Sequence, residues 1–383
     1  MINVTKTFLG DKEQFKQYID RIYETGWLTN HGPLSEQLEE RLKAFLGVRN
    51  IVLTSNGTLA LQVAYQALGI KGSAITTPFS FVATSSSLYW EKIRPIFADI
   101  DPHTWNLDPA RIEACIEPDT TAIVATHVFG NPCDVEAIQA IADRHGLKVI
   151  YDGAHAFGVR YKGSSVLGRG DVSTLSFHAT KLFHTIEGGA IITSDDDLAA
   201  RLRLLCNFGI ADTDRIDGPG INSKLNEVSA AMGLCVLDHV PEIFAERAEI
   251  AQRYEMAFAG HLDMQKPQPF SERNYSYFPV ALRDESHLLK SRTRLNQREI
   301  NPRRYFYPSL DTLDYLQPQR PQWRSRALSQ RVLCLPIYPG LPRRAQDQVV
   351  DTLLADLDTE HARPFASVRE VADFALVPAT ERP

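Results

Sequence analysis

From about residue 34 to residue 193, short apolar runs alternate with longer stretches in which apolar residues recur at helical spacing. Leu34, Leu38, Leu42 and Phe45 mark one face of a helix, and the apolar run 51–54 that follows is typical of a buried strand. The alternation predicts further strands at 74–77, 95–98, 122–126, 148–151, 173–177 and 189–193. Strands that are apolar on both faces and joined by helices indicate a mostly parallel sheet in an α/β domain.

The pattern changes after residue 210. Residues 211–224 are rich in glycine, proline and aspartate and predict a loop. The helical stretch 225–258 contains Pro241, which should kink or divide it. The remainder, with a strand-like run at 277–282 and helices expected near 286–299 and 342–357, suits a smaller α+β domain.

These patterns predict two domains and a tail. The large domain spans 1–241, the small C-terminal domain spans 242–360, and an extension follows at 361–383.

Composition narrows the class of protein. The chain has 383 residues, 44% hydrophobic and 23% charged, which excludes a disordered, collagen-like or small secreted scaffold. Its net charge of −6 argues against nucleic acid or an anionic membrane surface as a partner, because phosphate-dominated binding needs concentrated positive charge. Five widely spaced cysteines without a C-x-x-C pair predict buried free thiols in a reducing cytoplasm. No stretch has the pattern of a signal peptide or a membrane span.

Chemically distinctive residues follow several predicted strands, where ligand sites in open α/β sheets gather. The turn 55–58, Ser-Asn-Gly-Thr, precedes a helix and is either a phosphate cradle or a plain helix cap. Asp152 ends another strand among small and apolar residues, so it either pairs with a cation in a site or caps the next turn.

The third candidate is a lysine. Lys181 follows a strand and is either an amine nucleophile with a lowered pKa or an ordinary exposed lysine. The combination of Lys181 with Asp152 and with hydroxyls at Thr58 and Ser176 favours the first alternative. Pyridoxal phosphate requires such a set: an amine for its aldehyde, a carboxylate for its ring nitrogen, and donors for its phosphate. An aromatic of the segment 77–84 could lie on the cofactor ring or pack in the core.

The order of motifs along the chain resembles that of the fold type I, pyridoxal-phosphate-dependent sugar-nucleotide aminotransferases of the DegT and StrS kind, up to about residue 358. The motifs are G-W-L-T-N-H-G-P (26–33), S-N-G-T (55–58), T-P-F-S-F-V-A-T (77–84), D-I-D-P (99–102), T-H-V-F-G-N-P (126–132), D-G-A-H-A-F-G (152–158), S-F-H-A-T-K (176–181), E-G-G-A (187–190), N-S-K and A-A-M-G-L (within 222–234), R-R-Y-F-Y-P (303–308) and L-P-I-Y-P-G-L (335–341).

The resemblance implies a role for each matching residue. Lys181 would be the Schiff-base lysine and general acid/base, and Asp152 would pair with the ring nitrogen of the cofactor. The resemblance implies further cofactor contacts from Gly57, Thr58 and Ser176 to the phosphate, from Phe81 to the ring face, and from His155 near the phenolic oxygen.

The resemblance also implies a partner subunit and a substrate. Asn222 matches an asparagine that reaches the cofactor of the neighbouring subunit, which implies a homodimer with a shared active site. Residues that are candidates for contact with the sugar or diphosphate, or alternatively for packing between domains, are Thr29, Asn30, His31, His184, Arg304, Tyr305 and Tyr307. No metal site is expected.

The implied reaction is transfer of an amino group from glutamate to a nucleotide-linked keto-sugar. Lys181 is intact, whereas a dehydratase branch of the family has histidine there, so transamination is favoured over deoxygenation. The motifs are most similar to members that act on dTDP-4-keto-6-deoxyglucose for surface polysaccharide. The alternatives are a 3-keto sugar as acceptor, a non-catalytic regulatory protein on the same fold, and a dehydrogenase, which the lack of G-x-G-x-x-G disfavours.

Overall fold

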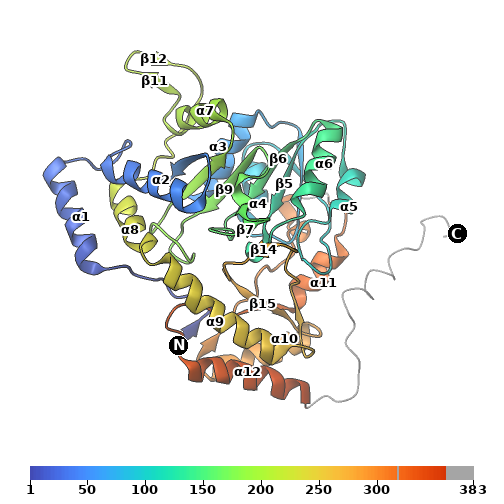
Figure 1. Ribbon diagram of the computed structural model, residues 1–383. Coiled ribbons are helices and arrows are strands. Elements are labelled where there is room, and N and C mark those ends of the chain that lie inside the picture. Colours follow the sequence, from blue (N-terminus) through green and yellow to red (C-terminus); the bar gives the residue numbers. More distant parts are fainter. Residues whose placement is uncertain (317–318, 359–383) are drawn as a thin grey trace.

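A seven-stranded sheet forms the centre of the protein in a computed structural model that describes residues 1–316 and 319–358 (Figure 1). Its strand order is β2-β10-β9-β6-β5-β3-β4, and β10 alone runs antiparallel to its neighbours. The bounds are β2 (Asn50–Thr54), β10 (Gly189–Thr193), β9 (Val172–Ser176), β6 (Lys148–Asp152), β5 (Thr120–Thr126), β3 (Ser73–Thr76) and β4 (Arg94–Phe97). Each predicted strand is present within two residues of its expected bounds.

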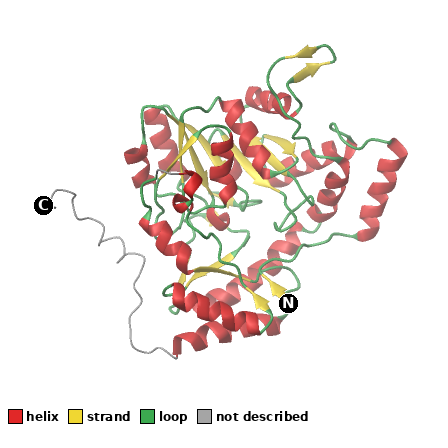
Figure 2. Cartoon of the chain, turned by 180° about the vertical axis from the view of Figure 1, so that it is seen from behind, coloured by secondary structure: helices red, strands yellow, loops and turns green. Residues whose placement is uncertain are grey.

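Helices cover both faces of this sheet, as the view from behind shows (Figure 2). Successive strand residues point to opposite faces, so in β2 Ile51 and Leu53 pack on one side and Val52 on the other. The first side is covered by α2 (Pro33–Leu46), α6 (Val135–His145) and α8 (Glu227–Leu237). The second side is covered by α3 (Gly57–Leu68), α4 (Val82–Trp90) and α7 (Asp196–Cys206). We call this assembly the sheet core.

A second, smaller core lies below the sheet core in the view of Figure 1. It is built mainly from the C-terminal part of the chain, and we call it the C-terminal core. It contains α9 (Val240–Phe258), α10 (Glu285–Gln297), α11 (Trp323–Arg331), α12 (Arg343–Asp358) and the antiparallel sheet β13-β15-β17 (Asp263–Met264, Phe278–Ala281, Val332–Leu335). The predicted strand and both predicted helices are therefore present. The fold class, a large α/β/α domain with a smaller C-terminal α+β domain, is confirmed.

The long helix α9 joins the two cores (Figure 1). Pro241 lies in its first turn, and a bend of 59° separates it from α8. Ile243 of α9 packs in the sheet core, whereas Ile250, Tyr254 and Phe258 pack in the C-terminal core. The boundary at residue 241 stays a prediction, and the extension at 361–383 lies outside the described residues.

The N-terminus also reaches the C-terminal core. The first strand, β1 (Ile2–Asn3), pairs in parallel with β16 (Ile300–Asn301), and α1 (Lys12–Thr25) then runs beside α8. The first residues of the predicted large domain therefore pair with a strand of the C-terminal part of the chain. The remaining elements are α5 (Pro109–Ile112), β7 (Arg160–Tyr161), β8 (Ser164–Ser165) and β14 (Ser271–Glu272), with short 3-10 turns at Glu113–Cys115, Val128–Gly130, Val166–Gly168, Leu310–Thr312 and Asp314–Leu316.

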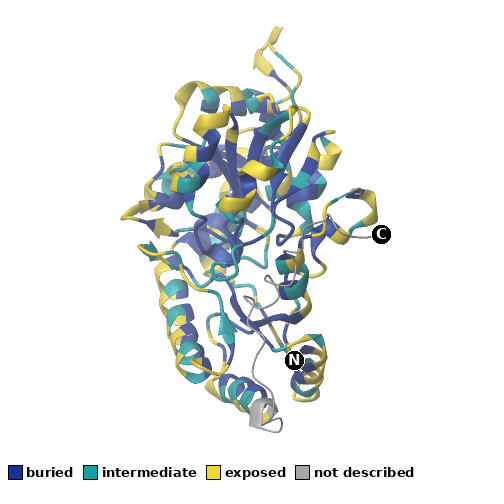
Figure 3. Cartoon of the chain, turned by 90° about the vertical axis from the view of Figure 1, so that its right-hand side faces the viewer, coloured by how far each residue is buried: buried dark blue, intermediate teal, exposed yellow. Residues whose placement is uncertain are grey.

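Two expectations about local structure need correction. The segment 211–224 is not wholly a loop, because β11 (Ile210–Asp212) and β12 (Arg215–Ile216) form an exposed hairpin that projects from the molecule (Figure 3). Of the five free cysteines, four are buried and Cys115 is only partly so.

Within the described residues no single helix has the length and apolar composition needed to cross a membrane, although α8 and α9 taken together, with the bend between them, would pass by those two criteria.

Candidate active site

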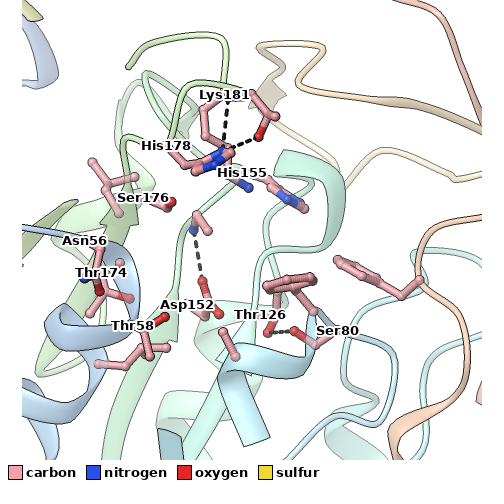
Figure 4. Close-up of a pocket in the computed structure, with 18 of the residues that line it drawn as sticks. Asn56, Thr58, Ser80, Thr126, Asp152, His155, Thr174, Ser176, His178 and Lys181 are labelled. Atoms are coloured by element: carbon pink, nitrogen blue, oxygen red, sulfur yellow. Dashed lines mark hydrogen bonds between the residues drawn. The ribbon is translucent and has the colours of Figure 1, made fainter. Parts of the chain in front are cut away.

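A cavity of about 300 Å³ opens at the carboxyl edge of the parallel strands. Asp152 is the last residue of β6, Thr126 ends β5 and Ser176 ends β9, while Asn56 and Ser80 follow β2 and β3. In Figure 4, Asn56, Thr58 and Ser176 lie on one side of Asp152, and Thr126 and Ser80 lie on the other. The parallel topology thus brings together side chains that lie up to 120 residues apart in sequence, from Asn56 to Ser176.

A chain of buried hydroxyl groups leads to the carboxylate of Asp152. Thr84 Oγ1 donates to Asp152 Oδ2 at 2.7 Å, and the Ala154 N–H donates to Oδ1 at 3.1 Å. Ser80 Oγ lies 2.8 Å from Thr84 Oγ1 and 2.9 Å from Thr126 Oγ1. A hydroxyl carries one proton, so Thr84 accepts from Ser80, and Ser80 accepts from Thr126. All donors in the chain therefore point toward Asp152, as an ionised carboxylate requires.

Lys181 lines the same cavity from the turn after β9. Its backbone N–H donates to the His178 carbonyl at 2.8 Å, which fixes the start of the side chain (Figure 4). Desolvation lowers the pKa of Lys181 to about 8; the charge of Arg303 adds to this effect, and Asp152 opposes it. The lowered pKa makes more of this amine uncharged near neutral pH than in an ordinary lysine, and an uncharged amine is the nucleophilic form.

The turn before α3 caps that helix and also presents a small site suited to an anion, which we call the Gly57 cradle. Asn56 is the N-cap, and its side chain accepts from the Leu59 N–H at 2.8 Å. Gly57 lies against β9, because a Cβ on it would come within 2.9 Å of the Ser176 Cβ. The positive end of α3 and the hydroxyls of Thr58 and Ser176 therefore face one small volume, which suits an anion.

Aromatic side chains also line the cavity. Phe81 is 46% exposed and its ring centroid lies 6.1 Å from that of Tyr305. His155 is buried, its Nε2 lies 3.5 Å from the Tyr305 hydroxyl, and its Nδ1 has no hydrogen-bond partner. Burial, reinforced by the charges of Lys181 and Arg303, lowers the pKa of His155 well below 6.5, so the imidazole is neutral at physiological pH.

Comparison with known proteins identifies this arrangement. The sequence matches the DegT/DnrJ/EryC1/StrS aminotransferase family over residues 10–354. The chain belongs to this family. It is 42% identical over 359 residues to a dTDP-4-amino-4,6-dideoxy-D-glucose transaminase of Shigella dysenteriae, covering 92% of this chain and 98% of that protein. A protein of the same name from Escherichia coli is 39% identical over 373 residues, covering 93% and 99%.

Solved structures agree with the sequence comparison. The crystal structure of DesI in the presence of its TDP-sugar product superposes with a TM-score of 0.88 at 34% identity, covering 94% of this chain and 93% of that one. The protein is therefore an aminotransferase that uses pyridoxal phosphate. The prediction of an enzyme is confirmed, against the alternative of a non-catalytic regulatory protein.

The donor set of the aminotransferase fits this cofactor. The cradle at Gly57 suits a phosphate, the carboxylate of Asp152 suits a protonated ring nitrogen, and Lys181 offers an amine for an aldehyde. Among the described residues there is no group of three or more His, Cys, Asp or Glu side chains that could hold a metal ion.

Every residue expected to contact the cofactor lines this cavity except Asn222. That residue is exposed, and it forms an isolated bridge with Asn207 on the segment after α7. The substrate candidates Thr29, Asn30 and His31 are also exposed and lie outside the cavity.

The other four substrate candidates lie in three different places. Tyr305 lines the cavity. His184 is buried; its Nε2 lies 2.7 Å from the Phe8 carbonyl, and its Nδ1 accepts from the Ile186 N–H at 3.2 Å. Both ring nitrogens of His184 are thus used by the backbone, which favours the packing alternative for it. Arg304 and Tyr307 line a neighbouring cavity instead.

Sequence reasoning missed several lining residues of the aminotransferase. Ser80, Thr126, Tyr277 and Arg303 were not singled out, although Ser80, Thr126 and Arg303 lie within quoted motifs. A motif identifies a segment of the chain, but only those of its side chains that point into the cavity can contact a ligand. Which side chains do so is known only from the structure.

Replacing Thr84 with valine should destabilise the protein by about 1–3 kcal/mol, because it removes the hydroxyl that donates to Asp152 Oδ2 and the group that accepts from the Ser80 hydroxyl. Thermal unfolding of the cofactor-free protein would show this as a lowered midpoint. Thr84→Ser, which keeps the hydroxyl, should recover most of the loss. Equal stability of the valine and wild-type proteins would contradict the hydrogen-bond chain.

Proposed function

We propose that the protein transfers the amino group of glutamate to the keto carbon of dTDP-4-keto-6-deoxyglucose, in the cytoplasm, for the synthesis of a surface polysaccharide. The names of the two transaminase relatives, at 42% and 39% identity, support the 4-amino sugar. The observation that carries the proposal is the convergence of Lys181, Asp152 and the Gly57 cradle on one cavity.

The cofactor contacts are assigned by the chemistry of each group. Lys181 would hold the cofactor covalently through Nζ, and the carboxylate of Asp152 would accept a hydrogen bond from the protonated ring nitrogen. Gly57, Thr58 and Ser176 hold the phosphate, and Phe81 covers one face of the ring. His155, a neutral imidazole, donates one hydrogen bond at the ring edge.

The chemistry follows from these positions. Pyridoxal phosphate, when bound, supplies an electron sink for the carbanion that forms at the carbon next to the nitrogen. Lys181, once displaced by the amino donor, takes the proton from the α-carbon of the donor, since its pKa of about 8 is matched to a base working near neutral pH. The carboxylate of Asp152 would stabilise the protonated form of the ring nitrogen. In the second half-reaction Lys181 returns a proton to the carbon of the sugar that receives nitrogen.

A homodimer completes the proposed site. Asn222 and the segment with Thr29, Asn30 and His31 are exposed outside the cavity in the single chain, so on this proposal they serve the active site of a neighbouring subunit. Two large apolar side chains beside that segment, Trp27 at 48% exposure and Leu28 at 62%, support a covered surface there.

The test is a panel of 3-keto and 4-keto nucleotide sugars incubated with glutamate and the holoenzyme, with products read by mass spectrometry. We expect amination of dTDP-4-keto-6-deoxyglucose together with stoichiometric 2-oxoglutarate. Preferential amination of a 3-keto sugar would overturn the position assigned, and no amination of any nucleotide sugar would overturn the acceptor class.

A further inference from the structure

A buried asparagine from the C-terminal part of the chain contacts the loop that carries His155. This loop, residues 153–158, follows β6. Asn274 lies between β14 and β15 and is 1% exposed. Its Nδ2 donates to the His155 carbonyl at 2.8 Å and to the Phe157 carbonyl at 2.9 Å. We call this pair of hydrogen bonds the Asn274 clamp.

The orientation of the amide in the Asn274 clamp is fixed by its partners. Its Oδ1 accepts from the Ser276 N–H at 3.0 Å, so both donors and the acceptor of the side chain are used. A flipped amide would place its oxygen against two carbonyl oxygens. Gly130 packs against the same atoms, because a Cβ on it would come within 2.7 Å of both Asn274 Oδ1 and the His155 carbonyl oxygen. The clamp is therefore a closely packed contact with one geometry.

The segment 274–277, which bears the clamp, is itself held by α9. Arg247 is buried on this helix, and its Nη1 donates to two consecutive carbonyls of the segment, at 3.0 and 3.3 Å. The last residue of the segment, Tyr277, lines the active-site cavity, and its ring centroid lies 4.8 Å from that of His155. Hydrogen bonds thus run from α9 through this segment to the loop that carries His155.

The imidazole of His155 depends on its backbone for its position. Its ring lies nearly parallel to the rings of Phe129 and Phe306, at interplanar angles of 3° and 6° and centroid distances of 6.1 and 5.8 Å. Such contacts orient the plane of a ring but supply no directional bond. Among the described residues Nδ1 has no hydrogen-bond partner, and Nε2 lies 3.5 Å from the Tyr305 hydroxyl, which is long for a hydrogen bond. The strong directional contact of this residue is its carbonyl, held by Asn274.

We propose that Asn274 is a positioning residue of the aminotransferase, which holds the carbonyls of residues 155 and 157 and thereby sets the place of the His155 imidazole at the edge of the cofactor ring. This inference rests on the proposed function for the contact between His155 and the cofactor. Asn274 itself does not line the cavity. Segment 274–277 and α9 thus contribute to cofactor binding through the loop that they hold.

The test measures the dissociation constant of pyridoxal phosphate for the full chain, by absorption titration after the bound cofactor has been removed. Asn274→Ala and His155→Ala should each raise this constant about two- to tenfold, the contribution expected of one neutral hydrogen bond. Because Asn274 acts through His155, the double variant should bind the cofactor no more weakly than His155→Ala alone. Amide hydrogen exchange of residues 153–158 should also be faster in Asn274→Ala than in wild type.

The chain offers a matched control in a second buried asparagine. Asn106 is also 1% exposed, its Nδ2 donates to the carbonyls of residues 131 and 132 at 3.1 and 2.9 Å, and its Oδ1 accepts from the Val128 N–H at 2.9 Å. It does not line the active-site cavity. Asn106→Ala should lower the midpoint of thermal unfolding as Asn274→Ala does, but it should leave the dissociation constant of the cofactor unchanged.

A milder variant keeps the test decisive if Asn274→Ala does not fold. The hydroxyl of Asn274→Ser can donate to one of the two carbonyls, so its dissociation constant should lie between those of wild type and the alanine variant. Wild-type affinity in a folded variant of Asn274 would overturn the inference. So would equal weakening of cofactor binding by Asn106→Ala, because the effect would then follow from lost stability alone.

The outcomes separate this inference from the proposed function. Further weakening when Asn274→Ala is added to His155→Ala would overturn action through His155. An unchanged dissociation constant in His155→Ala would overturn the proposed contact of the imidazole with the cofactor, and the positioning role with it. Non-additive weakening of cofactor binding, without amination of any sugar in the panel, would uphold the positioning role and overturn the proposed reaction.

Discussion

Replacing Lys181 with alanine is expected to abolish transamination and to remove the visible absorption band of the purified protein. The variant loses the only amine assigned both to hold the cofactor covalently and to move the proton. General acid–base catalysis alone contributes about 10²–10⁴-fold, so the fall in kcat should reach or exceed about 10⁴-fold. Absorption spectra and a glutamate half-reaction assay measure the two losses separately.

The control for Lys181 is another lysine of the same chain. Lys71 is exposed and lies outside the cavity, so Lys71→Ala should keep both the band and the activity. Thermal unfolding of both variants verifies that each is folded. An unchanged visible spectrum in Lys181→Ala would refute the assignment of the cofactor-bearing lysine.

Replacing Asp152 with asparagine is expected to lower kcat by about 10²–10³-fold, the cost of removing one preorganised electrostatic contact at a reacting centre. Asparagine keeps the size of the side chain, and its oxygen can still accept from Thr84 or Ala154, but the charge beside the ring nitrogen is gone. The measurement is steady-state kinetics under saturating cofactor, with Asp214→Asn in the exposed hairpin as the matched control.

The same variant has a second, independent readout. Asp152 raises the pKa of Lys181 by stabilising its ammonium form, so its removal should bring that pKa below about 8. The neutral amine is then available at lower pH. The rate at which the cofactor-free protein captures pyridoxal phosphate should reach half its maximum at a lower pH in Asp152→Asn than in wild type. A shift toward higher pH would show that the two groups do not interact as the structure has them.

The sheet was predictable because its strands are buried on both faces. Runs such as 148–151 and 173–177 are followed by Asp152 and a lysine, and the rule that ligands bind at carboxyl ends of parallel strands then placed these groups in one site. The hairpin of β11 and β12 was not predicted. Its residues are all exposed, so its strands lack the buried apolar face that hydrophobic periodicity detects.

The hydroxyl chain to Asp152 was not predictable for a different reason. Ser80, Thr84 and Thr126 are common residue types, and they meet only because β3 lies next to β5, and β5 next to β6, in the sheet. Hydrophobic periodicity predicts strands but not their neighbours. Likewise, nothing in the pair Arg303-Arg304 indicates which of the two is neutralised, since that depends on Glu285 of α10.

The continuous helix α9 links the unfolding of the two cores. Its 19 residues span about 28 Å at 1.5 Å per residue, and they pack against the sheet core at one end and the C-terminal core at the other. Neither core can lose its structure without exposing apolar surface on this helix. We therefore expect the two cores to unfold as one cooperative unit, and amide hydrogen exchange along α9 should then occur through openings that involve both of them.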